Sequence, residues 1–142
     1  KPGRYSIVVA GAAESNTFDL VAYELIELPE TFGIVPLLPG EPESFAIRNG
    51  EAPLREIFVP PGATRLEVAL NGGGDVDLVL RYLEAPDPSQ YLDTANGPDL
   101  FTAIAFGSEE SIVIEGPLPG VYVLAVVAVL DLQVVDVTVR LE

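Results

Sequence analysis

The chain has 142 residues, a formal net charge of −15, and no His, Cys, Met or Trp. Without His and Cys, it cannot form a Ser-His-Asp triad, a Cys-His dyad, a Cys/His zinc site or a disulfide framework. The excess of acidic side chains repels phosphate backbones, so nucleic acid is not an expected partner. A hydrophobic content of 49% is enough to build the core of one domain.

Apolar and polar residues alternate with a period of two through much of the chain, which is typical of β-strands. The dipeptide Asn49-Gly50 predicts a tight turn that pairs the first two strands. The glycines at 72–74 predict an antiparallel hairpin of the third and fourth strands, and prolines make 84–98 a loop. The expected strands are 43–49, 54–59, 64–71, 75–83, 100–106, 110–115, 121–129 and 134–141.

Many short strands with Gly and Pro turns, and no convincing helical period, predict an all-β sandwich or barrel. The longest apolar run, 121–130, is too short for a membrane-spanning helix, so no membrane span is expected. The chain begins at Lys1 without an initiator Met or a visible signal peptide. We therefore expect it to be a piece of a longer protein.

An internal repeat organises the chain, because residues 2–20 resemble residues 119–137 without a gap. The identical pairs are Pro2/Pro119, Gly3/Gly120, Tyr5/Tyr122, Val9/Val126 and Asp19/Asp136. This predicts a terminal β-hairpin over 1–25 that matches the end of an upstream repeat, a linker over 26–40, and a sandwich over 41–142. The alternative is that any two strand pairs that begin with Pro-Gly look alike.

Four segments resemble, in the same order, motifs of bacterial pre-peptidase C-terminal domains. They are FVPPGATRL at 58–66, GDVDLVL at 74–80, EESI at 109–112 and PGVY at 119–122. The resemblance implies an antiparallel β-sandwich of jelly-roll type with about eight to ten strands, which agrees with the strand pattern.

The same resemblance implies a non-catalytic accessory domain of a secreted bacterial peptidase or multidomain exoprotein. Such a domain lies outside the cell and acts in folding, secretion or docking. Its expected partners are neighbouring domains of the parent protein and a protein or polysaccharide surface. The similar collagen-binding modules of clostridial collagenases give the alternative of a collagen- or carbohydrate-binding module. Only Tyr122 remains of the tyrosine pair that usually follows Pro-Gly, which argues against collagen binding.

Asp75 and Asp77 stand two residues apart on an expected strand, so both carboxylates project from one face. Two such oxygen donors, with backbone carbonyls and water, predict a Ca²⁺ site, as in the calcium-binding relatives. The alternative is a pair of solvated charges that protects a strand edge. Candidate additional ligands are Glu41, Glu43, Asn71 and Asp99.

The tripeptide Asp93-Thr94-Ala95 resembles the signature of aspartic peptidases, in which two Asp residues share a proton. Its place in a proline-rich loop makes catalysis there a remote alternative. We expect no enzyme activity from this chain, and we expect the catalytic domain to lie elsewhere in the parent protein.

The strand over 121–129 is apolar on both faces, so its outer face is either covered or meets a partner. The predicted interaction surface consists of Val121, Val123, Val127, Val129, Leu130 and Leu132. Its partner would be another domain, a second copy, or the 1–25 hairpin, and a homodimer through edge strands or that hairpin is one form of this prediction. The alternative is a central strand covered by a loop of its own module.

Overall fold

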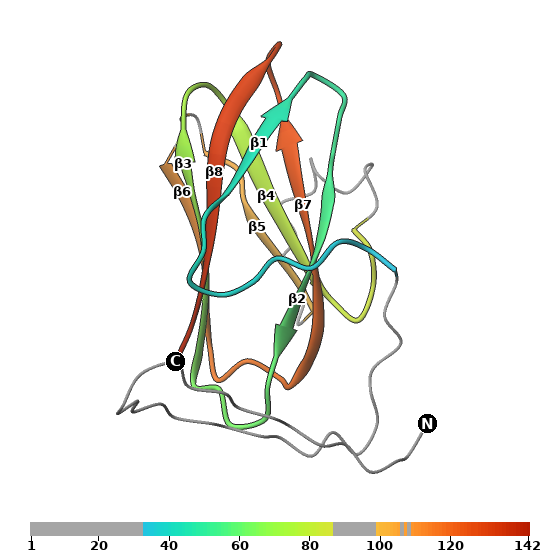
Figure 1. Ribbon diagram of the computed structural model, residues 1–142, viewed down its shortest axis with the longest axis vertical. Helices are drawn as coiled ribbons and strands as arrows, with labels where there is room; N and C mark the ends of the chain where they lie inside the picture. The colour runs from blue at the N-terminus through green and yellow to red at the C-terminus, as the bar shows by residue number, and fades with distance from the viewer. Residues whose placement is uncertain (1–32, 87–98, 106, 108) are drawn as a thin grey trace, which may run out of the picture.

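The computed structural model describes residues 33–86, 99–105, 107 and 109–142. In this part of the chain, eight antiparallel strands form two four-stranded sheets that pack face to face (Figure 1). One sheet has the order β1-β8-β3-β6 and the other has the order β2-β7-β4-β5. The predicted all-β sandwich is therefore confirmed. The bounds are β1 (Glu43–Ile47), β2 (Leu54–Val59), β3 (Arg65–Gly72), β4 (Val76–Tyr82), β5 (Leu100–Ala103), β6 (Glu109–Glu115), β7 (Gly120–Ala128) and β8 (Gln133–Leu141).

The local strand pairings predicted from the turns are wrong. β1 pairs with β8 and β2 with β7, so the turn at Asn49-Gly50 leads from one sheet to the other. β3 pairs with β6 and β8, whereas β4 pairs with β5 and β7, so these two strands do not form a hairpin. The alternation of apolar and polar residues shows which side chains face the core. A strand with this alternation can belong to either of the two facing sheets, so the alternation does not identify the strand to which it is hydrogen-bonded.

The side-chain alternation itself is confirmed. Ile112 and Ile114 of β6 face the core, and Val113 between them is exposed. β4 and β7 differ because most of their residues are buried on both faces. The core contains Val76, Leu78, Leu80, Tyr122, Leu124 and Val126 from these two strands. The described residues include no helix with the length and apolar character of a membrane span.

Residues 34–40 pack on the sandwich as an extended segment, which we call the strap. Figure 1 shows it in blue and cyan, crossing in front of β2. Leu37 donates its N–H to the Glu56 carbonyl at 2.8 Å, and the Gly40 N–H bonds to the Val139 carbonyl at 2.9 Å. The Leu37 side chain is part of the core. The packed domain thus begins before residue 41, where the sequence placed the end of a linker.

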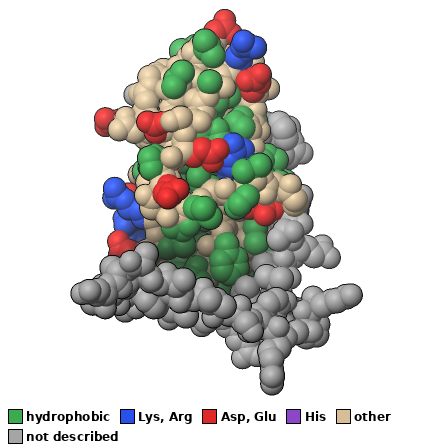
Figure 2. All heavy atoms as spheres, viewed as in Figure 1, with side chains coloured by type: hydrophobic (Ala, Val, Ile, Leu, Met, Phe, Trp, Pro, Cys, Tyr) green, Lys and Arg blue, Asp and Glu red, His purple; other side chains and the backbone are tan. Residues whose placement is uncertain are grey.

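The predicted 1–25 hairpin and the tripeptide at 93–95 lie outside the described residues. The second copy of the repeat is described, and there β7 and β8 belong to opposite sheets rather than to one hairpin. On the face seen in Figure 2, acidic side chains are scattered among apolar and uncharged ones.

Candidate functional site

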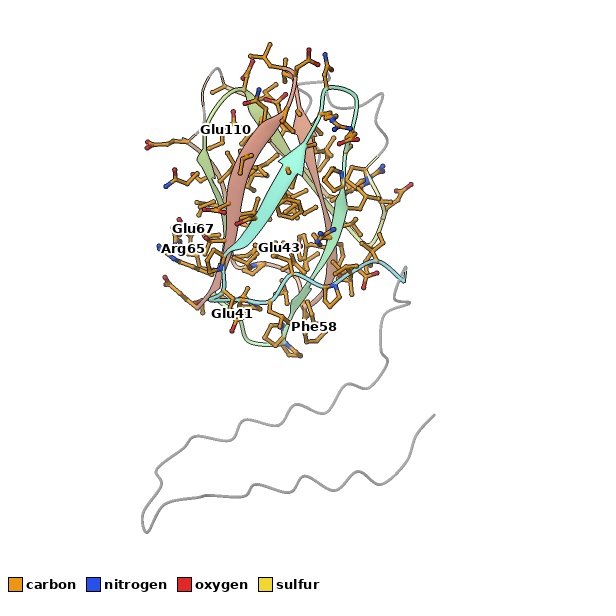
Figure 3. All side chains as sticks on the ribbon, turned by 45° about the horizontal axis from the view of Figure 1, so that its top comes forward. Glu41, Glu43, Phe58, Arg65, Glu67 and Glu110 are labelled. Carbon is orange, nitrogen blue, oxygen red and sulfur yellow. The ribbon has the colours of Figure 1, made fainter. Side chains whose placement is uncertain are left out.

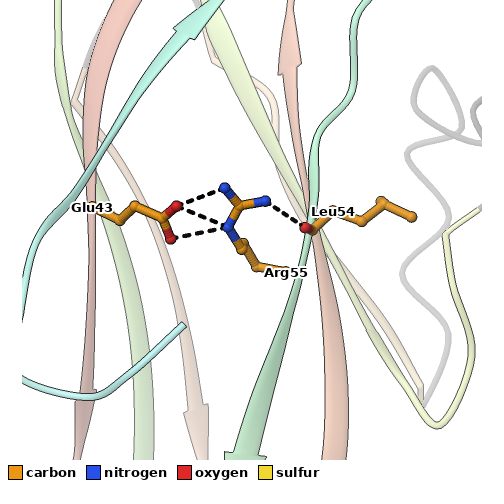
Figure 4. A network of polar contacts seen from close by, with 3 residues as sticks. All are labelled: Glu43, Leu54 and Arg55. Carbon is orange, nitrogen blue, oxygen red and sulfur yellow. Dashed lines mark hydrogen bonds and ion pairs between the residues drawn. The ribbon is translucent and has the colours of Figure 1, made fainter. Parts of the chain in front are cut away.

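A bidentate ion pair joins the two sheets at the edge where β1 lies next to β2 (Figure 4). Arg55 Nε donates to both carboxylate oxygens of Glu43 at 2.9 Å, and Nη2 donates to Oε1 at 2.6 Å. The third guanidinium nitrogen donates to the Leu54 carbonyl at 2.8 Å, and the guanidinium lies 4.7 Å from the centre of the Phe45 ring. Glu43, a candidate calcium ligand, is therefore bound to a cation of the chain itself.

Glu110 occupies the opposite edge of the sandwich. It sits at an inward-facing position of β6, in the same alternation as Ile112. Only 6% of the surface of Glu110 is accessible to solvent. Its Oε1 accepts the backbone N–H of Ala105, and its Oε2 is buried. The sequence motif EESI contained this residue, but its inward position follows only from the alternation.

Burial, more than any other cause, raises the pKa of Glu110 to about 7. Backbone hydrogen bonds from Ala105 and Leu78 oppose this rise in pKa, and the negative charges of Asp77 and Asp75 add to it. Figure 3 shows Glu110 near one end of the sandwich, far from Phe58. With a pKa of about 7, the Glu110 carboxyl group gains or loses its proton near neutral pH.

Asp75 and Asp77 are both buried, which contradicts the alternative of solvated charges at a strand edge. β4 is not an edge strand, since it lies between β7 and β5. Burial raises the pKa of Asp77 to about 6, and the charge of Asp75 contributes to that rise. The charges of Asp75 and Asp77 also act on Glu110, an interaction that the sequence did not reveal.

The arrangement of the acidic side chains bears on the calcium prediction. Within the described ranges, no group of three or more His, Cys, Asp or Glu side chains is arranged to hold a metal ion. Glu43 is bound to Arg55, and Glu41 and Asn71 are exposed. Calcium at Asp75 and Asp77 would depend on backbone carbonyls and water for its other ligands, so it stays a prediction.

The predicted interaction surface divides into a covered part and an exposed part. Val121 and Val123 are buried within this chain, and Val127 is half-buried. Val79 and Ala125 form a small second cluster with partly buried neighbours that include Ala52 from the β1–β2 connection. A loop of the module itself therefore contributes to covering this face. The exposed part is a tip that we define as Val129, Leu130 and Leu132, with 42%, 53% and 59% of their surfaces accessible.

Two glycines bring the end of β3 and the turn to β4 close against the start of β8. A Cβ on Gly72 would lie 2.6 Å from the Val134 carbonyl and 2.7 Å from Val135 Cα, which is backbone that cannot move aside freely. Gly74 lies directly beneath the side-chain amide of Gln133, and its φ of +104° favours glycine. Sequence reasoning treated these glycines only as turn residues.

Aromatic residues of the described part serve mainly as core. Among them only Phe58 is exposed, at 38%. The rings of Tyr82 and Tyr122 lie 5.0 Å apart. Tyr82 donates its hydroxyl hydrogen to the Pro119 carbonyl at 3.0 Å, and the Tyr122 hydroxyl oxygen accepts the Leu118 N–H at 3.1 Å. The tyrosine of the Pro-Gly motif thus anchors the turn before β7.

The outer face of the β1-β8-β3-β6 sheet carries an uneven charge cluster. Arg65 contacts Glu67 at 2.7 Å, Glu115 at 3.3 Å and Glu142 at 3.4 Å. Figure 3 shows Arg65 and Glu67 side by side on this face. One cation faces three carboxylates, so this end of the face keeps a negative potential.

The described fold is shared with a solved structure, the pre-peptidase C-terminal domain of collagenase from Bacillus anthracis. The two superpose with a TM-score of 0.50 over 78% of this chain and 98% of that domain, at 15% sequence identity. At this identity the match confirms the resemblance at the level of the fold. No protein-family model matches the chain, and no curated protein matches it.

Proposed function

We propose that this chain is a non-catalytic accessory domain of a secreted bacterial peptidase or multidomain exoprotein, acting in its folding, secretion or docking. The observation that carries the proposal is the shared sandwich, which extends over 98% of the collagenase domain. The order of the four sequence motifs supports the same assignment.

The roles of the polar residues support a structural part for the domain. Glu43 and Arg55 join the sheets, and Tyr82 and Tyr122 bond to the turn before β7. These side chains are used to hold the fold, which leaves reaction chemistry to other domains of the parent protein.

Docking to a neighbouring domain would use the exposed tip. The β7–β8 connection contains the three exposed side chains Val129, Leu130 and Leu132 within four residues. Leu132 has a φ of +28°, which is unusual for a residue with a branched side chain. Burial of these side chains against a neighbouring domain would remove apolar surface from water.

The proposal is tested by the coding sequence that precedes this chain, together with assays of the chain itself. We expect a secretion signal and a peptidase catalytic domain in the same reading frame, and no cleavage of casein or gelatin by the isolated chain. An upstream frame that encodes only cytoplasmic enzymes would contradict the assignment.

Collagen or polysaccharide binding is ranked lower because, in the described residues, only Phe58 among the aromatic side chains is exposed. Stacking surfaces for such ligands need several accessible rings. Co-sedimentation of the full chain with insoluble collagen, cellulose and chitin separates the two functions, and clear retention by any of them would reverse this ranking. Persistent cleavage of peptides by the purified chain, blocked by pepstatin, would favour the aspartic-peptidase alternative.

A further inference from the structure

β6 is an outer strand of its sheet and has a free edge in the described part of the chain. The Gly116 N–H donates to the Thr64 carbonyl at 2.8 Å, which fixes the phase of the antiparallel ladder between β6 and β3. The even-numbered residues of β6 therefore bond to β3. The backbone N–H and C=O groups of Glu109, Ser111, Val113 and Glu115 point away from β3, along the free edge.

The other outer strands offer less room for a further strand. The edge of β2 already receives the strap, because Glu56 of β2 accepts the Leu37 N–H and donates its own N–H to the Val35 carbonyl. β5 has only four residues, and β1 has five and is joined to β2 by the Glu43–Arg55 pair. β6 is seven residues long and alternates regularly between buried and exposed positions.

The solvent-facing side chains of β6 set the charge of an acceptable partner. Glu109 and Glu115 lie at its two ends, and Val113 between them is exposed. Arg65 contacts Glu115, but it is shared with Glu67 and Glu142. An incoming strand thus meets an acidic group at each end of the edge and an apolar group near its middle.

These charges also argue against a second copy of the same chain as the partner. In a two-fold antiparallel pairing centred on Ile112, Glu109 of each copy would lie directly opposite Glu115 of the other. Like charges directly opposite each other on neighbouring strands are destabilising. A β6 homodimer in this register is therefore disfavoured.

We propose that the β6 edge binds an extended cationic segment of a partner protein by antiparallel strand addition. Backbone groups of Ser111 and Val113 supply the hydrogen bonds, and Lys or Arg side chains of the segment lie opposite Glu109 and Glu115. Apolar residues of the segment cover Val113. The inference does not depend on the parent protein being a peptidase, because it uses only the edge and its charges.

The test uses the full chain and a fluorescein-labelled peptide, Lys-Thr-Val-Thr-Val-Thr-Lys, whose lysines fall opposite the two glutamates in antiparallel register. Fluorescence anisotropy should show saturable binding that weakens as salt rises. A peptide with both lysines replaced by glutamate should bind at least about tenfold more weakly, which corresponds to about 1.4 kcal/mol.

Two variants locate the binding on β6. Val113→Pro removes an N–H that points to solvent rather than to β3, so it should abolish peptide binding and leave the sandwich folded. Glu109→Lys should weaken binding about tenfold, whereas the matched charge reversal Asp131→Lys at the β7–β8 connection should change it less than about twofold. Circular dichroism checks that each variant is folded, and Glu109→Lys decides the outcome if Val113→Pro is not.

Several results would overturn the proposal. They are equal affinity for the lysine and glutamate peptides, absence of binding at about 1 mM peptide, unchanged binding in a folded Val113→Pro chain, or equal weakening by Glu109→Lys and Asp131→Lys. None of these results bears on the upstream coding sequence, so the accessory-domain proposal is tested separately.

Discussion

The carboxylate of Glu43 on β1 and the guanidinium of Arg55 on β2 bridge the two sheets through three nitrogen–oxygen contacts of 2.6 to 2.9 Å. The planar fork of the guanidinium matches the carboxylate, and packing on Phe45 fixes its orientation. The pair links the two sheets at the edge formed by β1 and β2, which belong to different sheets.

Glu43→Gln should lower the free energy of unfolding by about 1 kcal/mol, because the amide keeps the shape but loses the charge-assisted bonds. Urea unfolding at pH 7 measures the change. Glu41→Gln, two residues earlier and exposed, is the control and should stay within about 0.5 kcal/mol of the wild type. Equal effects of the two substitutions would mean that the ion pair contributes nothing beyond general charge.

Glu110→Gln should change the dependence of stability on pH. The pKa of Glu110 rises from 4.5 to about 7 on folding, so the folded chain holds this proton more tightly than the unfolded chain. The stabilisation from Glu110 is therefore complete below pH 4.5 and is lost as the pH rises through about 7. The glutamine variant does not lose it, so its stability relative to the wild type should increase by up to about 3 kcal/mol between pH 4.5 and pH 8.

Urea unfolding at several pH values across this range tests the expectation. Glu109→Gln, at the neighbouring exposed position, is the matched control and should show no such trend. A constant difference between Glu110→Gln and the wild type across this range would rule out the raised pKa.

Leu37→Ala should destabilise the chain by about 2–4 kcal/mol, because it leaves a cavity where the strap enters the core. Leu38→Ala removes the same atoms from a side chain that is 59% exposed and should cost less than about 0.5 kcal/mol. Thermal unfolding of both variants makes the comparison. Similar melting temperatures for the two would show that the strap is not part of the folded unit.

Gly72→Ala should cost about 1–3 kcal/mol, because its Cβ would collide with the backbone of Val134 and Val135. Gly73→Ala, the next residue, has nothing within 4 Å of a Cβ and should be nearly neutral. Guanidinium unfolding of the two variants isolates the steric effect of β3 packing closely on β8. A neutral Gly72→Ala would contradict that close approach.

The calcium prediction requires a metal-dependent melting temperature, because an ion that binds only the folded state stabilises it. If Asp75 and Asp77 hold the ion, millimolar calcium should raise the melting temperature relative to EDTA at a pH above about 6, where Asp77 is ionised. Asp77→Asn should remove this difference, and the exposed Asp131→Asn should keep it. Identical melting in calcium and EDTA would refute the site.

Alternation of side chains was enough to predict the strands and their buried faces, as Ile112 and Ile114 show. It did not predict the partner of each strand, because a glycine turn such as 72–74 can lead to a neighbouring strand or to the facing sheet. Leu37 was missed because it lies among prolines and a glycine, a composition typical of linkers.

The candidate site was predictable only in part. Asp75 and Asp77 were recognised from their spacing, but Glu110 comes close to them through the packing of one sheet on the other, which no local pattern encodes. Val123 was predicted to meet a partner or a covering loop, and its complete burial arises from contacts within this chain. Glu43 was considered as a metal ligand because nothing in the sequence links it to Arg55.

The strap has a mechanical consequence for a domain within a longer chain. Gly40 bonds to Val139 of β8, and the last residue, Glu142, exchanges two backbone hydrogen bonds with Arg65. Tension that enters the strap at its N-terminal end therefore meets Val35 and Leu37, which bond to Glu56 of β2, before it reaches Gly40 and β8. Because the Leu37 side chain is part of the core, the apolar interior bears force from the start, and the strap spreads the load over both sheets.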